Sequence, residues 1–183
     1  MAPATPGPHR FPVATVRAVD LHLEYPYEAP ADVVWAMFID PDFIRAKLEA
    51  TGALEYELVD CAQTPDGGYC ITTQRTVQAE IPAFARKIFN PTQSMTQIED
   101  WEADGGGTRP GEWRVETKGV PVTTGGPTRL ESTDHGCVQH IEGRIKVSVP
   151  LIGGRLEKFV FEQAKAITDT EHAFGVQWLA DRA

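Results

Sequence analysis

Two charged residues lie on strand faces that are otherwise apolar. The alternation of side chains places Arg75 on the same face of its predicted strand as Ile71, and it places Glu99 on the same face as Trp101. A charged group that leaves water requires an opposite charge or a charged ligand group beside it. We therefore expect Arg75 either to pair with Glu99 or to bind the acidic head group of a ligand. The alternative is a β-bulge that reverses the register and leaves both charges in solvent.

Uncharged polar residues also fall on apolar faces. Gln163 and Thr170 share the apolar stripe of a predicted C-terminal helix, and Gln139 shares a strand face with Ile141. A buried amide or hydroxyl requires a hydrogen-bonding partner, which a ligand, a water molecule or another side chain can supply. Ordinary polarity within a core is the alternative explanation. Together with the expected aromatic and aliphatic walls, the candidate ligand-binding residues are Trp35, Thr73, Arg75, Glu99, Trp101, Gln139, Gln163, Ile167, Thr170 and Phe174.

Metal binding and catalysis have weaker signals. His135, Cys137 and His140 are of the types that bind zinc, but a strand places Cys137 and His140 on opposite faces, so the three cannot converge. The glycines at 105–107 lack the Lys and Ser/Thr that end a phosphate-binding loop. No spacing indicates a nucleophile with its base. The sequence therefore predicts no metal and no cofactor, and it favours a binding protein over an enzyme.

The charge balance excludes several classes of partner. The chain of 183 residues carries 17 basic and 26 acidic side chains, a net charge of −9. Nucleic-acid binders present a basic surface, so nucleic acid is not an expected partner, and charge alone would not dock this chain on an anionic membrane. No apolar run approaches the roughly 20 residues that cross a bilayer. Three cysteines without a signal peptide favour reduced thiols and a cytoplasmic protein.

The remaining patterns predict an α+β protein. Residues 1–10 are rich in proline and are expected to form a flexible tail, followed by a single domain at 11–183. Apolar alternation from Val13 predicts a first strand, and helix signals predict two short helices at 31–38 and 40–52. Turn residues then divide the middle of the chain into six antiparallel strands, at about 54–62, 69–78, 94–103, 111–119, 122–132 and 137–149.

Two further segments complete this plan. The stretch 81–89 mixes aromatic and basic residues, and it predicts a short helix or a lid-like loop rather than a strand. From about 155 to 180 there is no proline, and apolar residues form one stripe at about 100° per residue, which predicts a long amphipathic helix. A seven-stranded sheet that curves around this helix leaves a hollow between them, which is a candidate small-molecule site.

Three segments carry a family resemblance. Pro30–Trp35 and Asp40–Phe43 resemble the opening motif of the START/Bet v 1-like superfamily, also called SRPBCC, and Val147–Lys158 resembles a bacterial branch of unknown function within it. The resemblance extends over about residues 11–181. It implies a helix-grip fold, in which the curved sheet wraps around the C-terminal helix and encloses a cavity for a hydrophobic or amphipathic ligand.

The expected function follows from this resemblance, and two alternatives remain open. The first expectation is the binding or carrying of a lipid- or polyketide-like small molecule in the cavity, without membrane insertion. One alternative is a cyclase- or hydrolase-like enzyme in the same cavity, with Glu99 as its general base. The other is a protein-interaction module with a vestigial cavity, whose contact surface is the basic and aromatic segment 84–89.

Overall fold

Seven strands form the main structural layer. The structure, a computed structural model, describes residues 18–182, so the predicted tail at 1–10 and the predicted strand start at Val13 lie outside the described residues. Strand boundaries differ from those predicted by at most a few residues. The strands are β1 (Val19–Tyr27), β2 (Ala53–Gln63), β3 (Tyr69–Gln78), β4 (Thr92–Trp101), β5 (Thr108–Thr117), β6 (Val122–Thr133) and β7 (Gly136–Val147).

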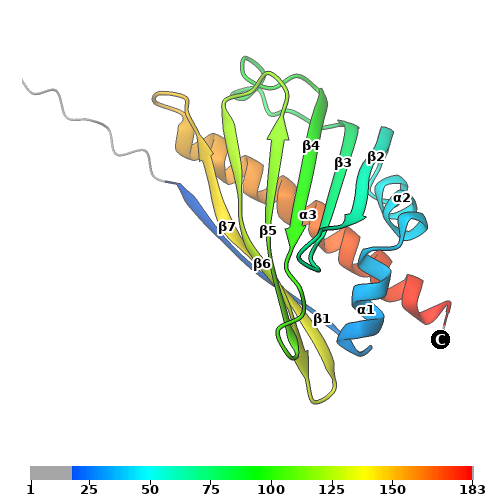
Figure 1. Cartoon of the computed structure of the whole chain (residues 1–183). Coiled ribbons are helices and arrows are strands. Elements are labelled where there is room, and N and C mark those ends of the chain that lie inside the picture. Colours follow the sequence, from blue (N-terminus) through cyan, green and yellow to red (C-terminus); the bar gives the residue numbers. More distant parts are fainter. Residues whose placement is uncertain (1–17, 183) are drawn as a thin grey trace, which may run out of the picture.

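The strands pair antiparallel in the order β1-β7-β6-β5-β4-β3-β2 (Figure 1). Each strand from β2 to β6 lies beside the strand that follows it in the chain. Short turns make these connections except between β3 and β4, where the longer segment 79–91 intervenes. The chain passes from the edge strand β1 to the edge strand β2 through two short helices, α1 (Ala31–Phe38) and α2 (Pro41–Ala50). This arrangement confirms the predicted α+β fold class.

The start and end of α2 follow the predicted capping chemistry. The side chain of Asp40 accepts the N–H of Asp42 at 2.9 Å, and Pro41 occupies a first-turn position where no donor is needed. Gly52, with φ of 80°, follows the end of the helix. The sequence therefore fixes α2 at both ends, and α2 is one of the elements that position the site described below.

The long helix α3 (Gly153–Ala180) crosses the concave face of the sheet, as predicted (Figure 1). Near its start, α3 is joined to the end of β7 by Glu157, whose side chain is buried and accepts the N–H of Val147 at 3.1 Å. Among the described residues, no helix combines the length and the hydrophobicity that crossing a membrane requires.

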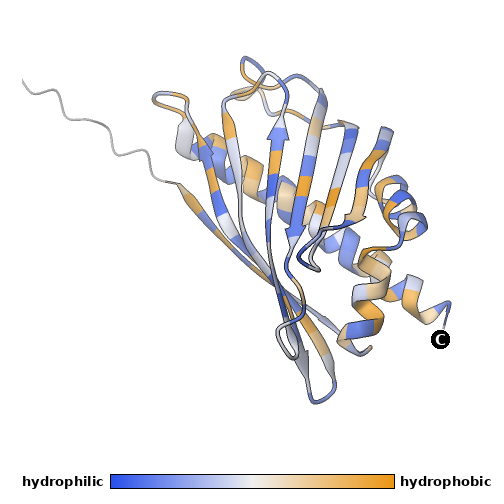
Figure 2. Ribbon diagram, in the orientation of Figure 1, coloured by the Kyte–Doolittle hydropathy of each residue, from blue (hydrophilic) through white to orange (hydrophobic). Residues whose placement is uncertain are grey.

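Apolar packing is concentrated toward the two ends of the sheet. Hydrophobic and hydrophilic positions alternate along the strands (Figure 2). The helices α1 and α2 and the C-terminal part of α3 pack one large cluster, which includes Met37, Phe43 and Trp101. The first turns of α3 pack a second cluster, which includes Phe89 and Leu156. The central part of α3 therefore lies between two packed regions.

The segment between β3 and β4 is not a strand, as predicted. Its backbone forms successive turns, with the N–H of Ala85 donating to the carbonyl of Pro82 and the N–H of Phe89 donating to that of Ala85, both at 2.9 Å. Ala85 and Phe89 are buried, whereas Arg86 and Lys87 are exposed. The segment therefore covers the second apolar cluster and presents its charges to solvent.

Candidate functional site

A cavity of about 220 Å³ lies between the concave face of the sheet and α3. The strands β1 and β3 to β7, the helix α2 and the central part of α3 contribute its lining. Most of the lining side chains are apolar, such as Ile71, Val115 and Ile141 from the strands and Val160 and Ile167 from α3. The site thus has the composition of a small-molecule pocket, in which a few polar groups interrupt an apolar wall.

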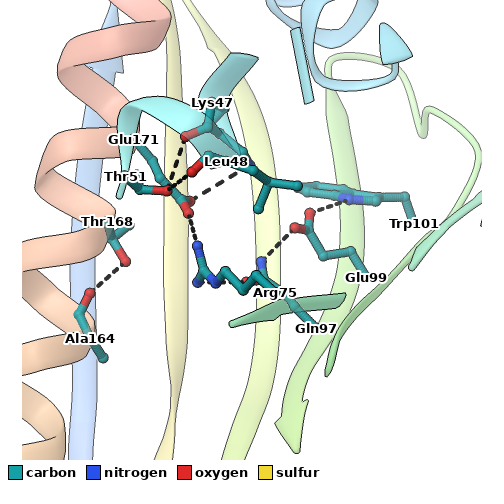
Figure 3. A network of polar contacts seen from close by, with 10 residues as sticks. All are labelled: Lys47, Leu48, Thr51, Arg75, Gln97, Glu99, Trp101, Ala164, Thr168 and Glu171. Carbon is teal, nitrogen blue, oxygen red and sulfur yellow. Dashed lines mark hydrogen bonds and ion pairs between the residues drawn. The ribbon is translucent and has the colours of Figure 1, made fainter. Parts of the chain in front are cut away.

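A buried ion-pair network lies on one side of this cavity (Figure 3). The Glu171 carboxylate on α3 accepts a hydrogen bond from Arg75 on β3, with Nη1 to Oε1 at 3.1 Å. Its other oxygen lies 3.6 Å from Nζ of Lys47 on α2. The side chains of Arg75 and Glu171 are only 6% and 15% exposed. One carboxylate therefore connects the sheet and both helices.

The network continues from Arg75 along β4. Nη2 of Arg75 donates to Oε1 of Gln97 at 3.4 Å, and Nε2 of Gln97 donates to Oε1 of Glu99 at 2.8 Å. Nε1 of Trp101 donates to the other oxygen of Glu99 at 3.1 Å. Within residues 18–182, the buried Nε–H of Arg75 has no hydrogen-bond partner. It is the one buried side-chain nitrogen or oxygen of the described residues that lacks such a partner.

Glu171 is held in its charged form. Burial alone would raise the pKa of its carboxyl, but the charges of Lys47 and Arg75 and their hydrogen bonds outweigh burial and hold the pKa below its ordinary value. The four charged residues that line the cavity, Lys47, Arg75, Glu99 and Glu171, are two cations and two anions. Their formal charges cancel.

The sequence of the chain matches a family model over most of its length. The model is described as "Protein of unknown function (DUF2505)" and matches residues 22–179. The chain belongs to this family. An uncharacterized protein of Mycobacterium tuberculosis is 23% identical over 172 residues, which is 90% of this chain and 98% of that protein. An uncharacterized protein of Mycobacterium bovis matches with the same identity and coverage.

Solved structures show the same fold. Human STARD10 is similar with a TM-score of 0.58 at 10% identity, over 92% of this chain and 68% of that chain. TTHA0849 from Thermus thermophilus is similar with a TM-score of 0.57 at 13% identity, over 87% of this chain and 98% of that chain. These likenesses confirm the START/Bet v 1-like helix-grip fold that the sequence motifs predicted.

Six of the ten candidate residues line the cavity, and one predicted pairing is wrong. The six are Thr73, Arg75, Glu99, Gln139, Gln163 and Ile167. Arg75 points inward because the pairing of β3 with β4 runs without a bulge from Tyr69 to Gln78. Its ionic partner is Glu171 and not Glu99, because Gln97 lies between the two strand charges and Glu99 accepts from Gln97 and Trp101 instead.

The other four candidates lie away from the cavity. Trp101 is buried in the cluster beneath α1, and Trp35 packs edge-on against it with ring centroids 5.5 Å apart. The ring of Phe174 stacks on that of Phe43, with ring centroids 5.8 Å apart. Thr170 is exposed, and its hydroxyl donates to the carbonyl of Ala166 at 2.9 Å. Three of these residues pack in or against the core, and Thr170 belongs to the solvent face of α3.

Three residues of the site escaped the sequence interpretation. Glu171 and Lys47 complete the ion-pair network. His172 lines the cavity and donates from Nε2 to the carbonyl of Pro26 at 2.8 Å. A signal for Glu171 existed, because it follows Ile167 by four residues and therefore continues an apolar stripe. A charge at such a position requires a buried partner.

The histidines and cysteines of the described residues do not converge on a metal site. Cys137 is buried on the concave side, whereas His140 lies on the convex side, 3.3 Å from a carboxylate oxygen of Glu24. In residues 18–182 no three metal-ligating side chains converge. Cys61 pairs across β2 and β3 with Ile71, next to Cys70, so these two thiols point to opposite faces of the sheet.

Proposed function

We propose that the protein binds an amphipathic small molecule in the cavity between the sheet and α3. The observation that carries this proposal is an interior space of about 220 Å³ whose apolar wall is interrupted by a buried polar network. Burial of apolar ligand surface would supply the main driving force, at roughly 25 cal/mol per Å². The polar groups would orient the ligand, because a buried donor or acceptor left unpaired is costly.

The charges of the network favour an uncharged polar group on the ligand. Arg75 already has Glu171 as its counter-ion, at 3.1 Å, so an acidic head group would have to displace a carboxylate from it. Gln139 and Gln163 line the same cavity from opposite walls and can donate to or accept from hydroxyl, carbonyl or amide groups. A ligand with a hydroxyl or carbonyl group and an apolar body matches this lining.

The enzymatic alternative gains no support from the site. The base that it requires, Glu99, accepts one hydrogen bond on each carboxylate oxygen, from Gln97 and from Trp101. Glu171 is held charged by two cations, which makes it a poor proton acceptor. Contacts within the protein therefore account for the arrangement of both carboxylates.

Filling the cavity should abolish binding without removing a polar partner. Ala164 lines the cavity from α3, so Ala164→Phe places an aromatic ring in the space that the ligand would occupy. We expect the affinity for Nile red, an uncharged apolar dye, to fall by about tenfold or more. Fluorescence titration measures this, and native mass spectrometry of the unsubstituted protein should show a co-purified small molecule that the variant lacks.

Ala166→Phe is the matched control. Ala166 is exposed on the same helix, and its carbonyl accepts from a threonine hydroxyl four residues later, as that of Ala164 does. The control should bind the dye as tightly as the unsubstituted protein. Equal dye affinity in the two variants would contradict the proposal, because the dye would then bind outside the cavity.

A further inference from the structure

Three connections meet at one end of the sheet and form a single surface, here named the loop end. It comprises residues 79–91, 118–121 and 148–155, at the upper end of the sheet in Figure 1. The N–H of Ser148 donates to the carbonyl of Pro121 at 3.0 Å, which joins two of the connections. The guanidinium of Arg155 lies over the ring of Phe84 at 4.3 Å, which joins the first and the third.

The loop end is basic, although the chain as a whole is acidic. It contains the cations Arg86, Lys87, Lys118 and Arg155 and one carboxylate, Glu80, within a chain of net charge −9. All four cations are exposed. In the described part of the chain, none of them forms an ion pair. Their positive charge is therefore available to a partner.

Leu151 lies in the third of these connections, between β7 and α3. Its side chain is fully exposed, and its backbone has φ of 68°, in the left-handed region that leucine rarely adopts. Glycine or asparagine would suit this backbone better, and water would suit a polar side chain better. Among the described residues, neither packing nor backbone conformation accounts for a leucine here. A contact with a partner would account for it.

We propose that the loop end docks on the surface of an anionic phospholipid bilayer. The four unpaired cations match anionic head groups, and the protruding leucine can enter the boundary between head groups and acyl chains. Nucleic acid would match the cations but would leave Leu151 without an apolar environment. A stable protein interface requires a broad apolar centre, whereas Leu151 is the one large apolar side chain of the loop end that is exposed.

The position of the loop end relative to the cavity agrees with this role. Ile81 and Phe89, from the first connection, and Phe159 and Val160, from α3, line the cavity and also belong to the apolar cluster beneath the loop end. A bilayer bound at this end would face the same wall of the cavity. Docking does not depend on the identity of a cavity ligand, so the two proposals are tested separately.

Vesicle co-sedimentation tests the proposal directly. The full chain should bind vesicles of phosphatidylcholine with about 30% phosphatidylglycerol, and not vesicles of phosphatidylcholine alone. Binding should weaken steeply as salt is raised from about 0.05 to 0.5 M. The double substitution Arg86→Gln with Lys87→Gln should weaken binding by about 25-fold, at about fivefold for each cation removed. Leu151→Asn should weaken vesicle binding by about tenfold, because it removes the apolar side chain. Asparagine tolerates the left-handed backbone, so this substitution should not strain the loop.

Arg45→Gln with Arg114→Gln is the matched control. Both arginines are exposed, lie outside the loop end and pair with exposed carboxylates, so the control removes the same net charge. It should bind vesicles within about twofold of the unsubstituted protein. Equal loss in both double variants would overturn the proposal, as would binding that does not depend on anionic lipid. Self-association that requires Leu151, without vesicle binding, would assign the surface to protein contact and would also overturn it.

Discussion

Replacing Glu171 with glutamine should lower the free energy of unfolding by about 3–5 kcal/mol. The substitution leaves two cations, Arg75 and Lys47, with side chains only 6% and 18% exposed and without their shared counter-ion. The cost arises from an uncompensated buried charge more than from the lost hydrogen bond, since glutamine can still accept from Arg75. Urea denaturation followed by circular dichroism measures the difference.

Glu162→Gln is the control on the same helix. Glu162 is exposed, and its pairing with Lys158 at 3.8 Å is solvated, so its loss should cost less than about 0.5 kcal/mol.

Replacing both partners of the buried pair, Arg75→Met with Glu171→Leu, should cost less stability than the sum of the two single substitutions. A loss below about 1 kcal/mol for Glu171→Gln would show that the network is more hydrated than its burial indicates.

The same carboxylate should give the stability a defined dependence on pH. The pKa of Glu171 is lower in the folded chain than its ordinary value near 4.5, so the pairing adds stability above that value. This contribution is lost as the pH falls through the lower, folded pKa. From about pH 5 to pH 3 the unsubstituted protein should therefore lose more stability than Glu171→Gln does.

The sequence predicts the strands and their inward faces well because alternation is a local property. Arg75 lies two residues from Thr73 and from Val77, and all three side chains are buried on one face, so its orientation follows from its own strand. Its partner could not be found in this way. Glu171 comes from an element 96 residues further along the chain, and only the packing of α3 on the sheet brings the two together.

The long helix shows why a fixed helical wheel assigns some residues wrongly. Near its start, Val160 and Gln163 face the cavity, whereas further along the inward residues are Thr168, Glu171 and His172. The inward face therefore rotates gradually around the helix, because a straight helix crosses a twisted and curved sheet. A wheel centred on the first stripe places Thr170 inside, although its side chain is exposed. The local sequence is thus enough to predict that the helix forms, but which of its residues face the cavity depends on how the helix packs on the sheet.

The strands β6 and β7 approach each other closely at two glycines, Gly126 and Gly143. A Cβ atom built on Gly126 would lie 2.4 Å from Cα of Gly143, and one on Gly143 would lie 3.0 Å from the ring of Trp113, which lines the cavity. The two strands keep one register across this point, with Gly125 opposite Arg144 and Thr128 opposite Ile141. Glycines therefore allow the two strands to approach closely here without a slip in pairing.

Gly126→Ala should destabilise the protein by about 2–4 kcal/mol, because the added methyl group meets backbone that cannot move without opening the β6–β7 pairing. Gly154→Ala is the matched control. Gly154 lies in the first turn of α3, a Cβ there would meet no atom within 4 Å, and its φ is not in the left-handed region. That substitution should stabilise the chain by about 0.4–1 kcal/mol, since it restricts only the unfolded state. Urea denaturation distinguishes the two signs, and a Gly126→Ala variant as stable as the unsubstituted protein would mean that the strands can separate at this point without loss of the fold.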